Sequence, residues 1–332
     1  MKCKGIVALS KGDPQWCDVP VTPPGPGEIQ VRMAATLVST GTERAWVNGL
    51  PNAIPEYPYI PGYCCAGWVE KTGIRTTGFQ EGDRVACYAV GVGHREIGNV
   101  PDYRVVKIPD GVSFSEAAFT SLGQTSLQGV RKCGIELGET VVSLGLGIVG
   151  ILALALARLN GAVSAVGIDR QESRLFTALQ CGADEVLWNE GKDWEEHYWS
   201  LTDGRGAEVV IENTGVPAVM AQACRIAADY GRVCILGCPR GSTSFDFYQL
   251  VQKKSITVLG AHAVDSIPTV QSYPRHWTFS DDAACFLKFL KKGALTVGPL
   301  IGEEVSKENA ISAYKGLMNQ EREVLGMIIH WE

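Results

Sequence analysis

Residues 141–150 read VVSLGLGIVG, an apolar run that leads directly into three glycines spaced Gly-x-Gly-x-x-Gly, Gly145, Gly147 and Gly150. The uninterrupted apolar segment after them, residues 148–160, is typical of a buried helix. A strand that turns through such glycines into a helix is the fingerprint of a dinucleotide-binding fold, because backbone N–H groups and the helix dipole can then meet a pyrophosphate. The alternative is that the glycines serve only the close packing of helix on strand.

A carboxylate at the end of the next apolar run supports the dinucleotide interpretation. Asp169 follows Gly150 at the ~20-residue spacing that places an acid on the adenosine ribose. Such an acid binds the ribose hydroxyls of NAD and repels the 2′-phosphate of NADP. Arg170 and Arg174 would hold that phosphate, so NADP remains an alternative. The predicted cofactor site combines the fingerprint, the segment around Asp169 and the ends of two later apolar runs. Its residues are Gly145, Leu146, Gly147, Ile148, Val149, Gly150, Asp169, Arg170, Arg174, Asn213, Thr214, Gly215, Leu236 and Gly237.

Outward from the fingerprint, short apolar runs alternate with helical patterns from residue 140 to residue 262. Strands that are apolar on both faces and joined by helices form a parallel sheet covered on both sides. The pattern predicts an α/β, doubly wound domain. Its expected strands are 141–147, 164–169, 208–215, 232–237 and 256–262, and its expected helices are 148–160, 172–180 and 218–229.

The segments on either side of this domain have a different composition. Residues 1–115 are rich in proline and glycine and carry short β-type runs, which predicts an irregular, mostly β domain. Ser113 with Glu116 forms a capping box that opens a helix. After a loop through Pro268 and Pro274, we expect a helix capped by Ser280 and closed by Gly293, a helix capped by Ser306, and a final strand over 324–330.

The composition excludes several classes of protein. The 332 residues carry 36 acidic and 30 basic side chains, net charge −6, with no basic block that could follow a nucleic-acid backbone. The longest apolar run, Ile148–Ala157, is far shorter than the ~20 residues that span a bilayer. The N-terminus lacks the pattern of a signal peptide, and eleven cysteines without framework spacing indicate reduced thiols. We expect a cytoplasmic protein with a small-molecule substrate and neither a nucleic-acid nor a membrane partner.

With the fingerprint in mid-chain, the sequence resembles the medium-chain dehydrogenase/reductase superfamily, which includes the zinc alcohol dehydrogenases. The resemblance implies an NAD(P)-dependent oxidoreductase with a GroES-like catalytic domain (residues 1–122), a Rossmann domain (123–295) and a C-terminal return to the catalytic domain (296–332). It also implies a homodimer, paired through the strand at 256–262. The segments that carry it are PGPGEIQVRM (24–33), GTE (41–43), PGYCCAGWV (61–69), FQEGDRVA (79–86), VVKIPDGVSFSEAA (105–118) and ENTG (212–215).

The metal ligands of that superfamily are missing here. Where the zinc enzymes carry Cys, His and Cys or Glu, this sequence has Thr40, Tyr63 and Ser121, none of which is a good zinc ligand. The four-cysteine lobe of the structural zinc is absent too. The pattern STGTER (39–44) with PGY (61–63) resembles a zinc-lacking branch that includes the bacteriochlorophyllide hydroxyethyl dehydrogenases. We expect no zinc.

A different metal site would have to use Cys64, Cys65, Cys87 and His94. Adjacent residues on a strand point to opposite faces, so at most one of Cys64 and Cys65 can enter any one site. Metal binding by this group is therefore disfavoured.

Without zinc, a side chain must polarise the substrate oxygen and move its proton. By the resemblance, Tyr63 stands near the reacting oxygen and is our first candidate for general acid/base. Thr42 matches the Ser/Thr that relays the proton, Glu43 is expected to brace the site, and Thr40 lies beside them. His94 is a candidate base or substrate contact. The alternatives are a packed Tyr63 aromatic ring and a His94 that sits in a surface loop.

These residues predict a zinc-independent, NAD-dependent enzyme that interconverts a secondary alcohol and its ketone. The substrate would be a polyol, cyclitol, sugar or larger hydroxy compound. One rival is a zinc-free enone or quinone reductase that uses NADPH. The other is a non-catalytic dinucleotide-binding protein, because fold alone does not fix function.

Overall fold

The computed structural model describes residues 1–262 and 277–332 in two compact units. Within these ranges the first unit comprises residues 1–121, 277–293 and 300–332, and the second comprises residues 122–262 and 294–299. The loop expected through Pro268 and Pro274 lies outside the described residues. Helix α9 (Phe279–Lys291) belongs to the first unit, because it contacts β7 (Val105–Lys107) and η1 (Asp102–Arg104). The Rossmann domain expected over residues 123–295 would have placed α9 in the second unit.

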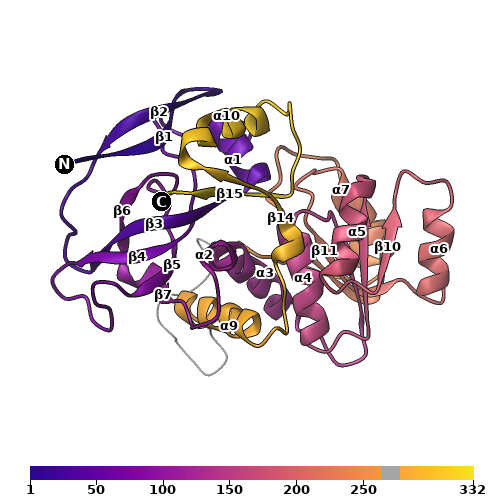
Figure 1. Cartoon of the computed structure of the whole chain (residues 1–332). Coiled ribbons are helices and arrows are strands. Elements are labelled where there is room, and N and C mark those ends of the chain that lie inside the picture. The colour runs from indigo at the N-terminus through magenta and orange to yellow at the C-terminus, as the bar shows by residue number, and fades with distance from the viewer. Residues whose placement is uncertain (263–276) are drawn as a thin grey trace. The chain divides into compact units, whose positions relative to one another are not determined.

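The second unit is the predicted doubly wound domain. Its parallel sheet has the strand order β10-β9-β8-β11-β12-β13, with helices distributed around it (Figure 1). The order reverses direction between β8 and β11, which is where open α/β sheets bind their ligands. The strands are β8 (Thr140–Leu144), β9 (Ser164–Asp169), β10 (Glu185–Trp188), β11 (Ala207–Glu212), β12 (Ala227–Ile235) and β13 (Thr257–Gly260); the helical segments are α3 (Thr120–Cys133), α4 (Ile148–Leu159), α5 (Glu172–Gln180), α6 (Trp194–Leu201), α7 (Val219–Ile226) and η2 (Tyr248–Gln252).

A core cluster of apolar side chains packs on one face of this sheet. Val142, Val166, Val210 and Val233, from four neighbouring strands, are completely buried in one cluster. Helix α7 ends at Ile226, three residues before the expected end, because the chain turns there into the long strand β12.

The first unit is built around a seven-stranded sheet with the order β14-β15-β3-β4-β5-β7 and β6 paired to β3. Both chain ends contribute: β15 runs antiparallel to β3, and Figure 1 shows this yellow strand beside the indigo one. A separate hairpin is formed by β1 (Lys2–Ser10) and β2 (Asp13–Pro20). The remaining strands are β3 (Glu28–Val38), β4 (Cys64–Thr72), β5 (Arg84–Tyr88), β6 (Ile97–Pro101), β14 (Ile301–Ser306) and β15 (Gly326–His330).

The helix starts are predicted correctly in two of three cases. The capping box of Ser113 and Glu116 opens α2 (Phe114–Ala117), and Ser306 precedes α10 (Lys307–Met318). The cap expected at Ser280 is wrong, because Thr278 caps α9 in a box with Asp281. Only Thr278 has an acid three residues on, whereas Ser280 has an alanine there.

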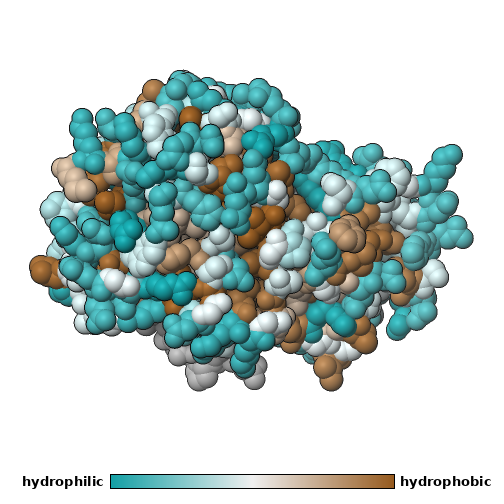
Figure 2. Space-filling view, viewed as in Figure 1, coloured by the Kyte–Doolittle hydropathy of each residue, from teal (hydrophilic) through white to brown (hydrophobic). Residues whose placement is uncertain are grey.

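The surface is mixed in character. Hydrophilic and hydrophobic side chains are interspersed on the face that Figure 2 shows. Across residues 1–262 and 277–332, no helix combines the length and apolarity that crossing a bilayer demands.

Candidate active site

The three fingerprint glycines have different roles. Gly145, at φ +93°, joins β8 to α4, and a Cβ on it would lie 3.0 Å from the Thr214 nitrogen. A Cβ on Gly150 would lie 2.0 Å from the Gly145 carbonyl oxygen, so α4 could not pack on β8 as it does. A Cβ on Gly147 would meet nothing within 4 Å. Gly145 and Gly150 therefore serve packing, while Gly147 keeps space open at the N-terminus of α4.

That open space suits an anion. Gly147 is the N-cap of α4 and brings no side-chain oxygen to the first-turn N–H groups. Ile148 and Val149 begin the helix there, so their N–H groups and the helix dipole favour a pyrophosphate. The residues present thus fit the dinucleotide that the sequence predicts.

Asp169 is held rigidly at the end of β9. It is 5% exposed; its Oδ2 accepts a hydrogen bond from the Leu146 N–H at 2.6 Å and its Oδ1 accepts one from the Gln171 N–H at 2.7 Å. A carboxylate has about four acceptor sites, which leaves capacity for ribose hydroxyls. Arg174 Nη1 lies 3.5 Å from Asp169 Oδ2. The Arg170 side chain is exposed, and its carbonyl oxygen accepts the Trp188 indole N–H at 2.8 Å.

Two loops at the carboxyl ends of β11 and β12 pack backbone against backbone. A Cβ on Gly237, which follows Leu236, would lie 2.7 Å from the Asn213 carbonyl carbon, and one on Gly215 would lie 2.6 Å from the Cys238 oxygen. The Asn213 amide nitrogen donates to the Ser143 hydroxyl at 2.8 Å, which ties this loop to β8. These predicted cofactor residues therefore lie at the same end of the sheet as the fingerprint.

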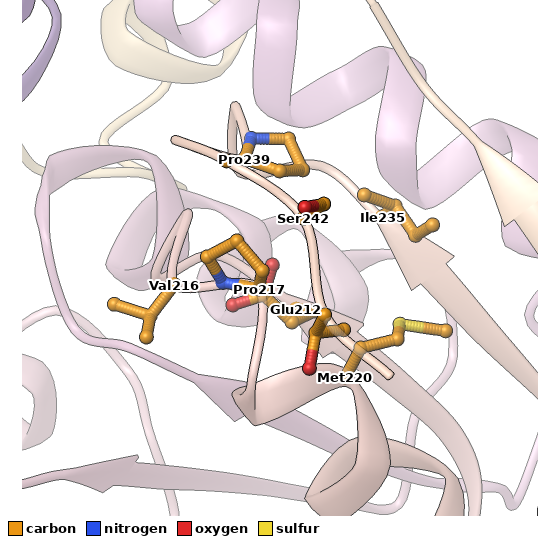
Figure 3. A pocket seen from close by; sticks show the side chains of 9 residues that line it. Glu212, Val216, Pro217, Met220, Ile235, Pro239 and Ser242 are labelled. Atoms are coloured by element: carbon orange, nitrogen blue, oxygen red, sulfur yellow. The ribbon is translucent and has the colours of Figure 1, made fainter. Parts of the chain in front are cut away.

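Glu212, at the end of β11, was not among the predicted site residues. It is buried, burial raises its pKa, and its Oε1 accepts bonds from both the N–H and the hydroxyl of Thr214. Glu212 thus fixes the turn through Thr214 and Gly215. Beside it lies a mostly apolar pocket of about 180 Å³, where Figure 3 shows Glu212 among Val216, Pro217, Met220, Ile235, Pro239 and Ser242.

In the first unit the structure brings Tyr63 and Thr42 together. Tyr63 directly precedes β4, and Thr42 lies on α1 (Thr40–Val47), a helix that the sequence did not predict. The Tyr63 hydroxyl donates to Ser39 Oγ at 2.9 Å and also hydrogen bonds to Thr42. Burial raises the pKa of Tyr63 well above that of a free phenol, and the two hydroxyls act in the opposite direction. Tyr63 is thus a protonated, hydrogen-bonded phenol rather than only a packed ring.

His94 is completely buried, so its alternative placement in a surface loop is wrong. Its Nε2 lies 2.8 Å from Glu43 Oε2, and its Nδ1 lies 2.9 Å from Thr36 Oγ1. The Thr36 hydroxyl also accepts the Trp331 indole N–H at 2.9 Å. Gly62 leaves room for the ring, because a Cβ there would lie 2.7 Å from it.

Glu43, which the resemblance places as a brace of the site, is buried among several hydrogen-bond donors. It is 1% exposed. Besides His94, its carboxylate accepts the Tyr314 hydroxyl at 2.9 Å and the Ser39 backbone N–H at 2.8 Å. A buried carboxylate is tolerated when several donors bind it in this way. Glu43 and Ser39 therefore link His94 and Tyr314 to Tyr63 by hydrogen bonds.

The donor set at the expected zinc position does not suit zinc. Thr40 Oγ1 donates to the Leu325 carbonyl at 3.2 Å, and Ser121 Oγ lies 3.5 Å from the Cys87 carbonyl. Tyr63 keeps its proton, whereas zinc prefers thiolate, imidazole and carboxylate ligands. Among residues 1–262 and 277–332, no three His, Cys, Asp or Glu side chains are grouped to hold a metal ion.

Two protein-family descriptions match the chain. "Alcohol dehydrogenase GroES-like domain" matches residues 25–115, and "zinc-binding dehydrogenase" matches residues 149–279. Together they span more than half of the sequence; the first match lies within the first unit and the second covers most of the second unit. The chain belongs to the medium-chain dehydrogenase/reductase superfamily. The predicted fold class, a GroES-like domain with a Rossmann-like parallel sheet, is confirmed, and the protein is an NAD(P)-dependent enzyme of this type.

Curated relatives of this superfamily are similar over most of the chain. The L-threonine 3-dehydrogenase of Pyrococcus furiosus is 28% identical over 77% of this chain and 82% of that protein. The sorbitol dehydrogenase of Bacillus subtilis is 23% identical over 91% of this chain and 90% of that protein.

Solved structures of the superfamily share the fold. Galactitol-1-phosphate dehydrogenase from Escherichia coli superposes with a TM-score of 0.85 at 19% identity, covering 99% of this chain and 100% of that one. A putative zinc-binding dehydrogenase from Sinorhizobium meliloti, bound to NADP, has a TM-score of 0.83 at 21% identity, with both chains covered completely.

Proposed function

We propose that this dehydrogenase interconverts a secondary alcohol and its ketone, with NAD as the hydride carrier and without zinc. The substrate class is a polyol, cyclitol, sugar or larger hydroxy compound. Relatives named for threonine and sorbitol support alcohol chemistry. The absence of zinc in this proposal rests on the Tyr63 hydroxyl. By the family resemblance Tyr63 occupies the position of a zinc ligand, and its hydroxyl hydrogen bonds to Ser39 and Thr42 instead.

Tyr63 supplies the proton chemistry in this proposal. Held at the N-terminus of α4 and by Asp169, NAD would supply the hydride acceptor for alcohol oxidation, and NADH the hydride donor for ketone reduction. In ketone reduction the Tyr63 O–H donates to the carbonyl oxygen, which gains its proton as negative charge develops there. In alcohol oxidation the phenolate of Tyr63 takes that proton back. Thr42, which hydrogen bonds to the Tyr63 oxygen, would relay the proton in this proposal.

We also propose a cytoplasmic homodimer. All eleven cysteines are free thiols, which fits a reducing compartment. Strand β13 is the edge of its sheet among the described residues, so its outer side can pair with a second copy.

The cofactor preference tests one half of the proposal. We expect NAD(H) to bind more tightly than NADP(H), because Asp169 lies at the ribose position and Arg174 is turned toward its carboxylate. Calorimetric titration with both cofactors measures this preference. The variant Asp169→Asn removes the negative charge and should reduce the difference in affinity between NAD(H) and NADP(H). Tighter binding of NADP(H) by the parent protein would assign the ribose pocket to Arg170 and Arg174 and favour the enone reductase.

A further inference from the structure

Ser39 stands at a helix N-cap but does not cap the helix. It is the residue before α1, where a serine side chain usually accepts an N–H from the first turn, and its side chain makes no such bond. Its hydroxyl instead accepts the Tyr63 O–H at 2.9 Å. Ser39 is 8% exposed, so this hydroxyl is largely withdrawn from solvent.

The backbone of Ser39 is fixed independently of its hydroxyl. Its N–H donates to Glu43 Oε1 at 2.8 Å, and its carbonyl accepts the Glu43 N–H at 2.9 Å. The other oxygen of Glu43 is held by His94 and Tyr314 at 2.8 and 2.9 Å. This buried array sets the position of Ser39 Oγ and leaves the hydroxyl hydrogen free to rotate.

Rotation matters because a hydroxyl is both a donor and an acceptor. When the Tyr63 oxygen carries its proton, Ser39 accepts from it. When the Tyr63 oxygen is a phenolate, Ser39 and Thr42 can both turn and donate to it. Hydrogen bonds to a charged group are the stronger ones, so the two hydroxyls favour the phenolate over the phenol. Their effect opposes the burial that raises the pKa of Tyr63.

We propose that Ser39 is a further catalytic residue, which stabilises the Tyr63 phenolate by donating a hydrogen bond to it. The inference rests on the proposed role of Tyr63. In ketone reduction, the Tyr63 O–H bond breaks and its proton forms the O–H bond of the product alcohol as hydride adds to the carbonyl carbon. The phenolate that remains, bonded to Ser39 and Thr42, regains a proton from solvent water. Alcohol oxidation runs through the same species in reverse.

The test is Ser39→Ala, which removes only the hydroxyl and keeps the backbone bond to Glu43. We expect kcat for alcohol oxidation at neutral pH to fall about 10- to 100-fold, because a lost bond to a charged group is worth about that factor. Without the Ser39 hydroxyl, the pKa of Tyr63 is higher. The pH at which the rate of alcohol oxidation reaches half its maximum should therefore rise by about one to two units. The affinity for NAD should stay at the parent value.

Thr76→Val is the matched control. The Thr76 hydroxyl donates to the Glu28 carbonyl at 3.2 Å, and we expect the parent pH profile for this variant. A second readout needs no substrate: a fluorinated tyrosine at position 63, whose phenol is more acidic, is titrated by absorbance with Ser39 and with Ser39→Ala. The expected result is a higher midpoint with alanine.

Two failures are distinguishable. If Tyr63→Phe lowers kcat but Ser39→Ala keeps the parent pH profile and the parent titration midpoint, the role of Ser39 is wrong and that of Tyr63 stands. If Tyr63→Phe itself keeps the parent rate and pH profile, the acid/base role of Tyr63 in the proposed function is wrong. The titration of the fluorinated tyrosine alone then decides whether Ser39 stabilises the phenolate.

Discussion

Replacing Tyr63 by phenylalanine is expected to lower kcat by a factor of about 10² to 10⁴, while the affinity for NAD stays close to that of the parent. The variant keeps the aromatic ring, whose centroid lies 5.4 Å from that of Tyr88, and removes only the hydroxyl. That hydroxyl matters most as charge develops on the substrate oxygen, so its loss affects the transition state more than binding. Steady-state kinetics and NAD titration measure both quantities.

Tyr57→Phe is the control for this experiment. The Tyr57 hydroxyl donates to the Val47 carbonyl at 3.0 Å in the same unit, so its removal costs a hydrogen bond without touching the site. We expect this variant to retain the parent kcat. If Tyr63→Phe stays within about threefold of the parent and a folded His94→Gln variant loses ~100-fold, His94 is the acid and the assignment to Tyr63 is wrong.

Two alanine substitutions in the fingerprint should have opposite consequences. Gly150→Ala places a methyl group 2.0 Å from the Gly145 carbonyl oxygen, so α4 must move off β8, and we expect a loss of ~1–3 kcal/mol or more in the free energy of unfolding. Gly147→Ala meets no protein atom within 4 Å and should leave that free energy almost unchanged. Its methyl group would instead fill the space at the N-terminus of α4, and NAD affinity should fall about 10- to 100-fold, the worth of a lost bond to a charged group.

Thermal unfolding and calorimetric NAD titration of both variants separate packing from binding. Equal NAD affinity in Gly147→Ala and the parent would show that the glycines serve only the packing of helix on strand. A Gly150→Ala protein with the parent melting temperature would contradict the steric argument.

The Rossmann unit could be predicted closely because its signals are local. The apolar runs, the glycine spacing and Asp169 lie within one β–α–β segment, where chain geometry forces them together. The four-residue strand β10 is too short for a clear period. At α9, the acid three residues after Thr278 was the signal that distinguishes it from Ser280.

The catalytic unit was only partly predictable because its polar contacts are long-range. Glu43 meets Tyr314 across 271 residues of sequence, and Thr36 meets Trp331 across 295. No local pattern connects such residues. The position of His94 in a glycine-rich stretch suggested a loop, whereas Gly62 opens a buried space for its ring. Ser39 likewise bonds Tyr63 across 24 residues of sequence, and no local pattern marks a serine for that contact.

The central claim is NAD-dependent alcohol chemistry without zinc, and turnover by metal-stripped protein tests it most directly. The protein is treated with a chelator, its zinc content is measured by elemental analysis, and NADH formation is followed over a panel of secondary alcohols, polyols and sugars. We predict less than one zinc per chain and an NAD-reduction rate that chelation does not lower and added zinc does not raise. One tightly held zinc per chain, with activity lost on its removal and restored on its return, would contradict the account.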